Sequence, residues 1–146
     1  MISTTIKTII IDDNEDWLQI IEAGVNAHPK LELIGTFNSP ITAHAFITEE
    51  KVDLIFLDVE MPEVNGLEFA KYLMNPPLII FVTSHRNYAV ESYEINAVDY
   101  LIKPYSTLRF MQAVEKASLK LNEKRSATSP KHDSFFFIRE DRKSVV

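Results

Sequence analysis

The sequence predicts an α/β fold in which helices cover both faces of a five-stranded parallel sheet. Two observations lead to this expectation. Five short apolar runs alternate along the chain with segments of helical periodicity. The runs are continuously apolar, as strands buried on both faces are. The length of 146 residues fits one such domain with a short appendage.

Local signals mark the elements in order. Asn14 can cap a first helix, and Ser39 precedes Pro40, a residue favoured at the first position of a helix. The expected strands are Thr8–Ile11, Leu31–Phe37, Leu54–Leu57, Leu78–Val82 and Tyr100–Ile102. The remaining helices are expected at Gly66–Leu73, at Tyr88–Ile95 and over the buried stripe of Phe110, Val114, Ala117 and Leu121.

The composition excludes several classes of site. The chain has no cysteine, so disulfides, thiolate metal sites and a cysteine nucleophile are excluded. Its only glycines are Gly24, Gly35 and Gly66, so it has no glycine-rich phosphate loop. The longest apolar run, Leu78–Val82, is too short to cross a bilayer, and residues 1–7 lack the pattern of a secretory signal. We therefore expect a cytoplasmic protein without membrane contact.

Charge divides the chain into an acidic body and a basic end. Residues 1–122 contain 9 Lys or Arg and 17 Asp or Glu, a net charge of −8. Residues 123–146 contain 6 and 4, a net charge of +2. An acidic body is unsuited to gripping nucleic acid directly, and it fits a cation site or a basic protein partner.

The sequence pattern changes after Leu121. Residues 122–133 are polar and contain a proline, which predicts a linker. The apolar run Phe135–Ile138 follows, and a single strand is not stable alone. We expect this run to dock on the body or to open a second domain whose remainder is absent. The nearby end of the chain at Val146 favours the second alternative.

Chemically active side chains follow four of the expected strands. Asp12 and Asp13 follow the first strand, and Asp58 follows the third. Thr83 follows the fourth strand and Lys103 the fifth. If the strand order is 2-1-3-4-5, these residues meet at the carboxyl edge of the sheet, where ligands bind in such folds.

Three neighbouring carboxylates need a cation. They repel one another, and they satisfy the preference of Mg²⁺ for hard oxygen ligands. With the metal bound, one carboxylate can attack a phosphoryl group, while Lys103 pairs with the phosphoryl oxygens and Thr83 donates a hydrogen bond. Each residue alone has an ordinary structural explanation, such as a helix cap or a surface lysine. Their joint occurrence at strand ends favours function.

Together, the motifs at these strand ends resemble the receiver domain of two-component response regulators. The resemblance covers residues 6–121. It implies a flavodoxin-like, doubly wound (βα)5 sandwich of strand order 2-1-3-4-5, with a receiver domain over residues 1–121. The segments that carry it are Ile11–Glu15, Leu57–Pro62, Gly66, Val82–Ser84 and Asp99–Pro104.

The resemblance also implies a role for each site residue. Asp58 would accept a phosphoryl group from a sensor histidine kinase, and Lys103 would contact that group. Thr83 would be the switch hydroxyl and Tyr100 the switch aromatic, and the peptide bond after Lys103 would be cis. No enzyme activity is implied beyond self-phosphorylation and self-dephosphorylation on Asp58. The implied Mg²⁺ ligands are the carboxylates of Asp12, Asp13 and Asp58 and the backbone carbonyl of Glu60.

A narrower resemblance concerns the output of the signal. Asn87–Glu94 and Ala97–Leu101 resemble receivers that precede a LytTR-type DNA-binding domain, and Phe135–Arg139 is similar to that domain's first strand. Residues 134–146 would then begin a truncated LytTR-like domain, and DNA would be contacted only through its absent remainder. Phosphorylation would promote a homodimer through the fourth helix, fifth strand and fifth helix. Ser84 stands where many receivers have alanine, which can change access to the phosphoryl group.

Three other functions fit parts of the pattern. A phosphohydrolase with an aspartyl nucleophile would use an acidic residue two positions later, where Glu60 stands, but no cap domain is present to enclose a substrate. An interaction module independent of phosphorylation would keep the acidic pocket only for structure. Flavin binding on the same fold is disfavoured because Asp12 and Asp13 would repel an anion.

Overall fold

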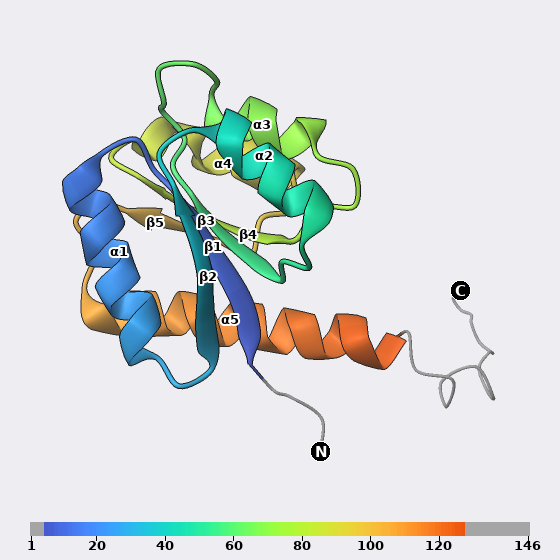
Figure 1. Ribbon diagram of the computed structural model, residues 1–146. Helices are drawn as coiled ribbons and strands as arrows, with labels where there is room; N and C mark the ends of the chain where they lie inside the picture. Colours follow the sequence, from blue (N-terminus) through green and yellow to red (C-terminus); the bar gives the residue numbers. More distant parts are fainter. Residues whose placement is uncertain (1–4, 128–146) are drawn as a thin grey trace.

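Five parallel strands form a single sheet in the order β2-β1-β3-β4-β5, as the sequence predicts (Figure 1). The computed structural model describes residues 5–127, without the side chains of residues 90, 92, 93 and 127. Every neighbouring pair of strands in the sheet runs parallel. The strands are β1 (Ile6–Ile11), β2 (Leu31–Phe37), β3 (Leu54–Leu57), β4 (Leu78–Thr83) and β5 (Asp99–Ile102).

Helices cover both faces of this sheet, which completes the predicted doubly wound (βα)5 sandwich (Figure 1). One face carries α1 (Glu15–Ala27) and α5 (Thr107–Ala127). The fourth helical segment begins with a short 3-10 turn that the sequence pattern does not reveal. The other face carries α2 (Pro40–Glu49), α3 (Gly66–Tyr72), the 3-10 turn η1 (Arg86–Tyr88) and α4 (Ala89–Glu94).

Alternation along the central strands divides the core between the two faces. In β1, Ile6 and Ile10 belong to the cluster under α1 and α5, whereas Ile9 and Ile11 belong to the cluster under α2 and α3. β3 alternates in the same way and is buried throughout. Because both faces are covered, both sets of side chains are apolar, which explains the continuous apolar runs of the sequence.

The predicted helix caps are present, and a further one fixes the start of α3. The side chain of Asn14 accepts a hydrogen bond from a first-turn N–H at 3.0 Å, and Ser39 Oγ accepts one at 3.1 Å. Asn65 caps α3 in the same manner, with a distance of 2.7 Å. Each cap satisfies an N–H that has no partner within the helix, so the three loops end at defined residues.

α5 extends into the predicted linker, residues 122–133. The helix continues to residue 127, which corrects the helix end expected from the buried stripe. Its last turn is stabilised because two basic residues lie at the negative end of the helix dipole. One of them, Arg125, lies 3.5 Å from the buried carboxylate of Asp53. The rest of the linker and residues 134–146 lie outside the described part of the chain.

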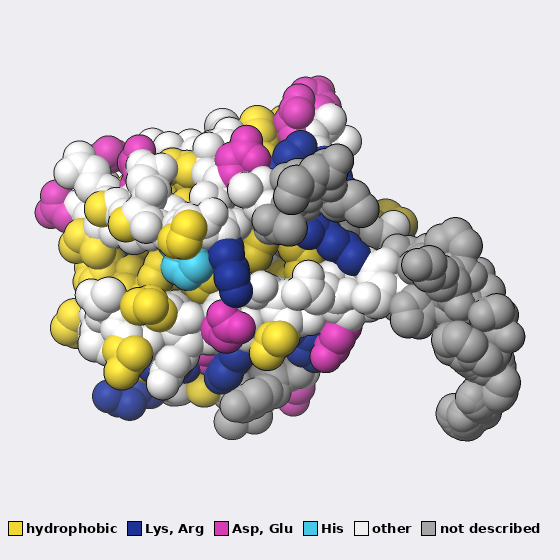
Figure 2. Space-filling view, turned by 90° about the horizontal axis from the view of Figure 1, so that it is seen from below, with side chains coloured by type: hydrophobic (Ala, Val, Ile, Leu, Met, Phe, Trp, Pro, Cys, Tyr) yellow, Lys and Arg dark blue, Asp and Glu magenta, His cyan; other side chains and the backbone are white. Residues whose placement is uncertain are grey.

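The surface over α1 and α5 carries apolar and charged side chains together. Figure 2 shows the molecule from below, with apolar side chains gathered on the left. Basic and acidic side chains lie beside one another near the middle of the same view. Large exposed apolar residues of these helices include Ile20, Leu108 and Met111. Among the described residues, no helix is both long and apolar enough to cross a membrane.

Candidate functional site

The acidic side chains that the strand order predicts to converge lie together at the carboxyl edge of the sheet. β1 and β3 are neighbours, with Ile11 opposite Leu57, so the residues that follow them emerge side by side. Asp12, Asp13 and Asp58 each place one carboxylate oxygen within 4.8 Å of the others. The structure thus brings the three carboxylates into a single cluster, hereafter the acidic cluster.

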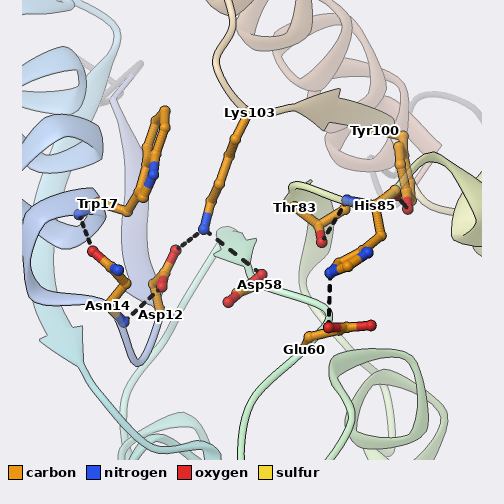
Figure 3. A network of polar contacts seen from close by, with 9 residues as sticks. All are labelled: Asp12, Asn14, Trp17, Asp58, Glu60, Thr83, His85, Tyr100 and Lys103. Carbon is orange, nitrogen blue, oxygen red and sulfur yellow. Dashed lines mark hydrogen bonds and ion pairs between the residues drawn. The ribbon is translucent and has the colours of Figure 1, made fainter.

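Asp12 is fully buried and is held from two sides. Its Oδ1 accepts a hydrogen bond from the N–H of Asn14 at 2.9 Å, and its Oδ2 accepts one from the ammonium of Lys103, also at 2.9 Å. The same ammonium lies 3.8 Å from Oδ1 of Asp58 (Figure 3). Because the side chain of Lys103 is only 7% exposed, it is a fixed cation between two carboxylates and not a surface lysine.

The electrostatics of the acidic cluster favour a bound cation. Burial and the charge of Asp12 raise the pKa of Asp58 to about 7, although Lys103 opposes the shift. Asp13 is exposed, so one side of the cluster is open to water. Closely spaced carboxylate oxygens with access to water fit Mg²⁺, which keeps several waters when protein ligands bind it. The residues present therefore fit the predicted magnesium site.

The loop after β3 is fixed by contacts with β1 and α3. The N–H of Asp58 donates a hydrogen bond to the carbonyl of Ile11 at 2.9 Å, and the N–H of Gly66 donates one to the carbonyl of Val59 at 2.6 Å. A Cβ on Gly66 would lie 2.1 Å from the carbonyl oxygen of Asp58. Only glycine allows α3 to begin this close to the backbone of Asp58.

The two predicted switch residues meet at the loop after β4. Thr83 is buried, and its Oγ1 accepts a hydrogen bond from the N–H of His85 at 3.4 Å. The hydroxyl of Tyr100 donates a hydrogen bond to the carbonyl of His85 (Figure 3). Burial raises the pKa of Tyr100 to about 12, so its hydroxyl remains a donor at neutral pH. Thr83 and Tyr100 are thus connected through the backbone of His85.

A polar cluster that the sequence does not predict lies beside the acidic cluster. The carboxylate of Glu60 points toward the loop after β4, where its Oε1 lies 2.8 Å from Nε2 of His85 (Figure 3). Its Oε2 accepts a hydrogen bond from the hydroxyl of Tyr88 at 2.9 Å. Glu60, Tyr88 and Asp13 all line a hollow of about 410 Å³. The side chain of Glu60 is therefore engaged with His85 and Tyr88.

Asp99 fixes β5 to α5. Arg109 donates two hydrogen bonds to its carboxylate, at 2.8 and 2.7 Å, and the ammonium of Lys116 lies at 3.3 Å. Burial opposes ionisation of Asp99, but these cations and the N–H of Tyr100 hold its pKa below the usual range. At the other end of β5, the peptide bond between Lys103 and the following proline is cis, as the resemblance implies.

Comparison with known proteins identifies the family to which this chain belongs. The sequence matches the response regulator receiver domain family over residues 8–115. Transcriptional regulatory protein YpdB of Escherichia coli strain K12 is 27% identical over 93% of this chain, which spans 59% of that protein. Sensory transduction protein LytT of Enterococcus faecalis is 28% identical over 94% of this chain, which spans 60% of that protein. The match to LytT agrees with the narrower resemblance to LytTR-type regulators.

A solved structure shares the fold with significant sequence identity. The response regulatory domain of protein MrkE from Klebsiella pneumoniae is 30% identical, with a TM-score of 0.75. The superposition covers 81% of this chain and 99% of the MrkE domain. The family match includes every strand-end residue of the acidic cluster and its surroundings. The chain therefore belongs to the response regulator receiver domain family, the receiving module of two-component systems.

Proposed function

We propose that this receiver accepts a phosphoryl group on the carboxylate of Asp58 and so controls an attached regulatory domain. The observation that carries the proposal is the meeting of the acidic cluster with the ammonium of Lys103 at one edge of the sheet. Acidic side chains that formed only a solvated surface would not require a buried lysine among them. Here the lysine lies between Asp12 and Asp58, where it can pair with the oxygens of a phosphoryl group.

The proposed transfer needs no general base when Asp58 is ionised, a form that the charge of Lys103 favours. One oxygen of Asp58 attacks phosphorus, the new O–P bond forms, and the bond to the donor breaks with its electron pair remaining on the leaving group. The donor is the phosphohistidine of a sensor histidine kinase. Lys103 pairs with the transferred oxygens. Asp12, Asp13, Asp58 and the carbonyl of Glu60 would hold Mg²⁺, which would offset negative charge on the phosphoryl group.

Phosphorylation then changes the partners of the two switch residues. Thr83 turns its hydroxyl from the N–H of His85 toward the phosphoryl group, and Tyr100 leaves the carbonyl of His85 and turns inward. The present contacts of both residues with His85 support this coupling. The change shifts the population toward a second packing of the α4–β5–α5 face, through which two receivers form a homodimer.

The output domain forms a further part of the proposal. Residues 87–94 and 97–101 resemble receivers that precede a LytTR-type domain, and residues 135–139 resemble the first strand of that domain. Both resemblances support a DNA-binding domain after the linker. YpdB is named a transcriptional regulatory protein, and this chain spans 59% of its length. A homodimer of receivers would place two such domains on paired half-sites of DNA.

Labelling with acetyl phosphate tests the proposed function. We expect intact-mass spectrometry to show the addition of one phosphoryl group when Mg²⁺ is present, and no addition when the metal is removed with EDTA. The MrkE domain, treated in parallel, controls for the quality of the donor. A chain that gains no phosphoryl group while the control is labelled would refute the proposal.

Mg²⁺ is expected to stabilise the fold through the acidic cluster. A ligand that binds only the folded chain raises the free energy of unfolding by about 2.7 kcal/mol at 100 times its Kd. Urea unfolding with and without Mg²⁺ measures this increment. Asp13→Asn should reduce it, whereas Asp16→Asn, which also changes an exposed aspartate near the start of α1, should retain it. An equal increment in both variants would contradict the assigned site.

Thr83→Ala should separate phosphorylation from its structural consequence. The acidic cluster and Lys103 are unchanged in this variant, so labelling should continue at nearly the wild-type level. Dimerisation should not follow, because no hydroxyl is available for the phosphoryl group. Light scattering before and after labelling measures this, and Thr83→Ser, which keeps the hydroxyl, is the matched control. Dimerisation of phosphorylated Thr83→Ala at the wild-type level would rule out the switch.

The phosphohydrolase alternative requires a different use of Glu60. As an acid and base, its carboxylate would have to reach the substrate, but it contacts His85 and Tyr88. Repeated turnover of a simple phosphate ester by the chain would favour the hydrolase over the receiver. We expect at most one phosphoryl group per chain and its slow loss.

A further inference from the structure

The buried ammonium of Lys103 has a contact that the proposed transfer does not use. Its Nζ lies 5.1 Å from the centroid of the Trp17 ring. Figure 3 shows the indole on one side of the lysine and the carboxylates of Asp12 and Asp58 near its tip. A cation within about 6 Å of an aromatic face is attracted by the ring, and more strongly when water is excluded.

We propose that Trp17 is a positioning residue whose ring holds the ammonium of Lys103 where it meets the phosphoryl group on Asp58. The inference rests on the proposed function and deepens it. A lysine side chain is flexible, so pairing with a phosphoryl group requires something that fixes it. Its carboxylate partners change during the proposed reaction, because Asp12 would bind the metal and Asp58 becomes an acyl phosphate. The Trp17 ring remains unchanged throughout.

Trp17, in the first turn of α1, is connected to Asp12 through Asn14. The N–H of Trp17 donates a hydrogen bond to Oδ1 of Asn14 at 3.0 Å, and the N–H of Asn14 donates one to Oδ1 of Asp12 at 2.9 Å. Oδ2 of Asp12 accepts a hydrogen bond from Lys103, whose ammonium lies against the Trp17 ring. Trp17, Asn14, Asp12 and Lys103 are thus connected in a closed ring of contacts (Figure 3). The position of the ring is therefore coupled to that of Asp12.

Further aromatic rings support the indole from the core. The centroids of Trp17 and Tyr105 are 5.6 Å apart. Tyr105 stacks on Phe110 at 5.9 Å, and Phe110 stacks on Phe56 of β3 at 5.4 Å. Since Phe56 is fully buried, this series of rings connects Trp17 to the centre of the sheet. The indole is thus a fixed surface against which the lysine can rest.

The emission of Trp17 tests the contact in solution. It is the only tryptophan of the chain, so the tryptophan fluorescence reports this position alone. We expect Lys103→Met to shift the emission maximum of the unphosphorylated protein, because it removes the charge beside the ring. Lys71→Met, which changes an exposed lysine on α3, should leave the spectrum unchanged. Identical spectra for wild type and Lys103→Met would overturn the proposal.

Labelling rates test the positioning role. Trp17→Leu removes the aromatic face, whereas Trp17→Phe keeps one. With acetyl phosphate and saturating Mg²⁺, we expect the rate constant of labelling to fall about tenfold in Trp17→Leu and by less than about threefold in Trp17→Phe. Because phenylalanine is also larger than leucine, its rescue supports the aromatic contact only together with the emission shift of Lys103→Met.

Two kinetic results would overturn the inference: wild-type rates in both variants, or equal losses in both. Urea unfolding of the same samples separates a lost fold from a misplaced lysine. If Trp17→Leu does not fold, the labelling rate of Trp17→Phe and the emission spectrum of Lys103→Met still test the positioning role. A wild-type chain that is not labelled would refute the proposed function and the inference with it, whereas a labelled wild type with unaffected variants would refute the inference alone.

Discussion

Asp58→Asn should abolish phosphoryl labelling by acetyl phosphate in the presence of Mg²⁺. An amide has no anionic oxygen with which to attack phosphorus. We expect no labelling of the neighbouring Asp12, which is fully buried and already hydrogen-bonded to the N–H of Asn14 and the ammonium of Lys103. The change replaces one carboxylate of a mutually repelling cluster with a neutral group of the same shape, so the fold should be retained. Intact-mass spectrometry measures the loss.

Asp53→Asn is the matched control for this prediction. Asp53 and Asp58 are both buried and flank opposite ends of β3. Asp53 accepts a hydrogen bond from the N–H of Lys7 at 2.9 Å, far from the carboxyl edge of the sheet. We expect wild-type labelling of this variant. Labelling of Asp58→Asn to the same extent as Asp53→Asn would show that another residue is the nucleophile.

Gly66→Ala should destabilise the fold and displace the loop that carries Asp58. The added Cβ would lie 2.1 Å from the carbonyl oxygen of Asp58 and 3.0 Å from Cα of Val59, so backbone and not a flexible side chain would have to move. Overpacking of this kind costs about 1–3 kcal/mol, and we expect the upper end of that range. The labelling rate should also fall, because the nucleophile shifts relative to Lys103. Urea unfolding and the rate of labelling measure the two effects.

Gly24→Ala is the matched control: it makes the same substitution within a helix, where the nearest neighbour is a side chain and not backbone. Its added Cβ would lie 3.2 Å from the ring of Phe110, a longer distance than at Gly66 and one to a side chain rather than to backbone. Alanine also favours a helix over glycine by about 0.5–1 kcal/mol, which offsets part of the crowding. We expect a small change in unfolding free energy and normal labelling. Equal effects at both glycines would argue against a special role for Gly66.

Most of the fold could be predicted because its signals are local. The apolar runs are continuous where strands are buried on both faces, and Asn14 and Ser39 mark helix starts at the residues observed. The end of α5 could not be predicted in this way. Beyond Leu121 the buried stripe stops, and the last turn is stabilised by Arg125 against Asp53, a partner remote in the sequence.

The acidic cluster could be predicted because strand order brings strand ends together whatever their separation in the sequence. Contacts between loops follow no such rule. His85 contacts Glu60 and Tyr100, and neither spacing is periodic, so the histidine has the sequence pattern of a surface residue. Trp17 has the spacing of a core residue on α1. The signal that could have placed it at the site is its position in the first helical turn, directly beyond Asp12.

The position of the phosphoryl group on the chain tests the central claim most directly. Borohydride reduces an aspartyl phosphate to homoserine, which marks the modified residue permanently for peptide mapping by mass spectrometry. After treatment with acetyl phosphate and Mg²⁺, we expect homoserine at position 58 and at no other aspartate. Homoserine at a different position, with Asp58 unmodified, would contradict this account.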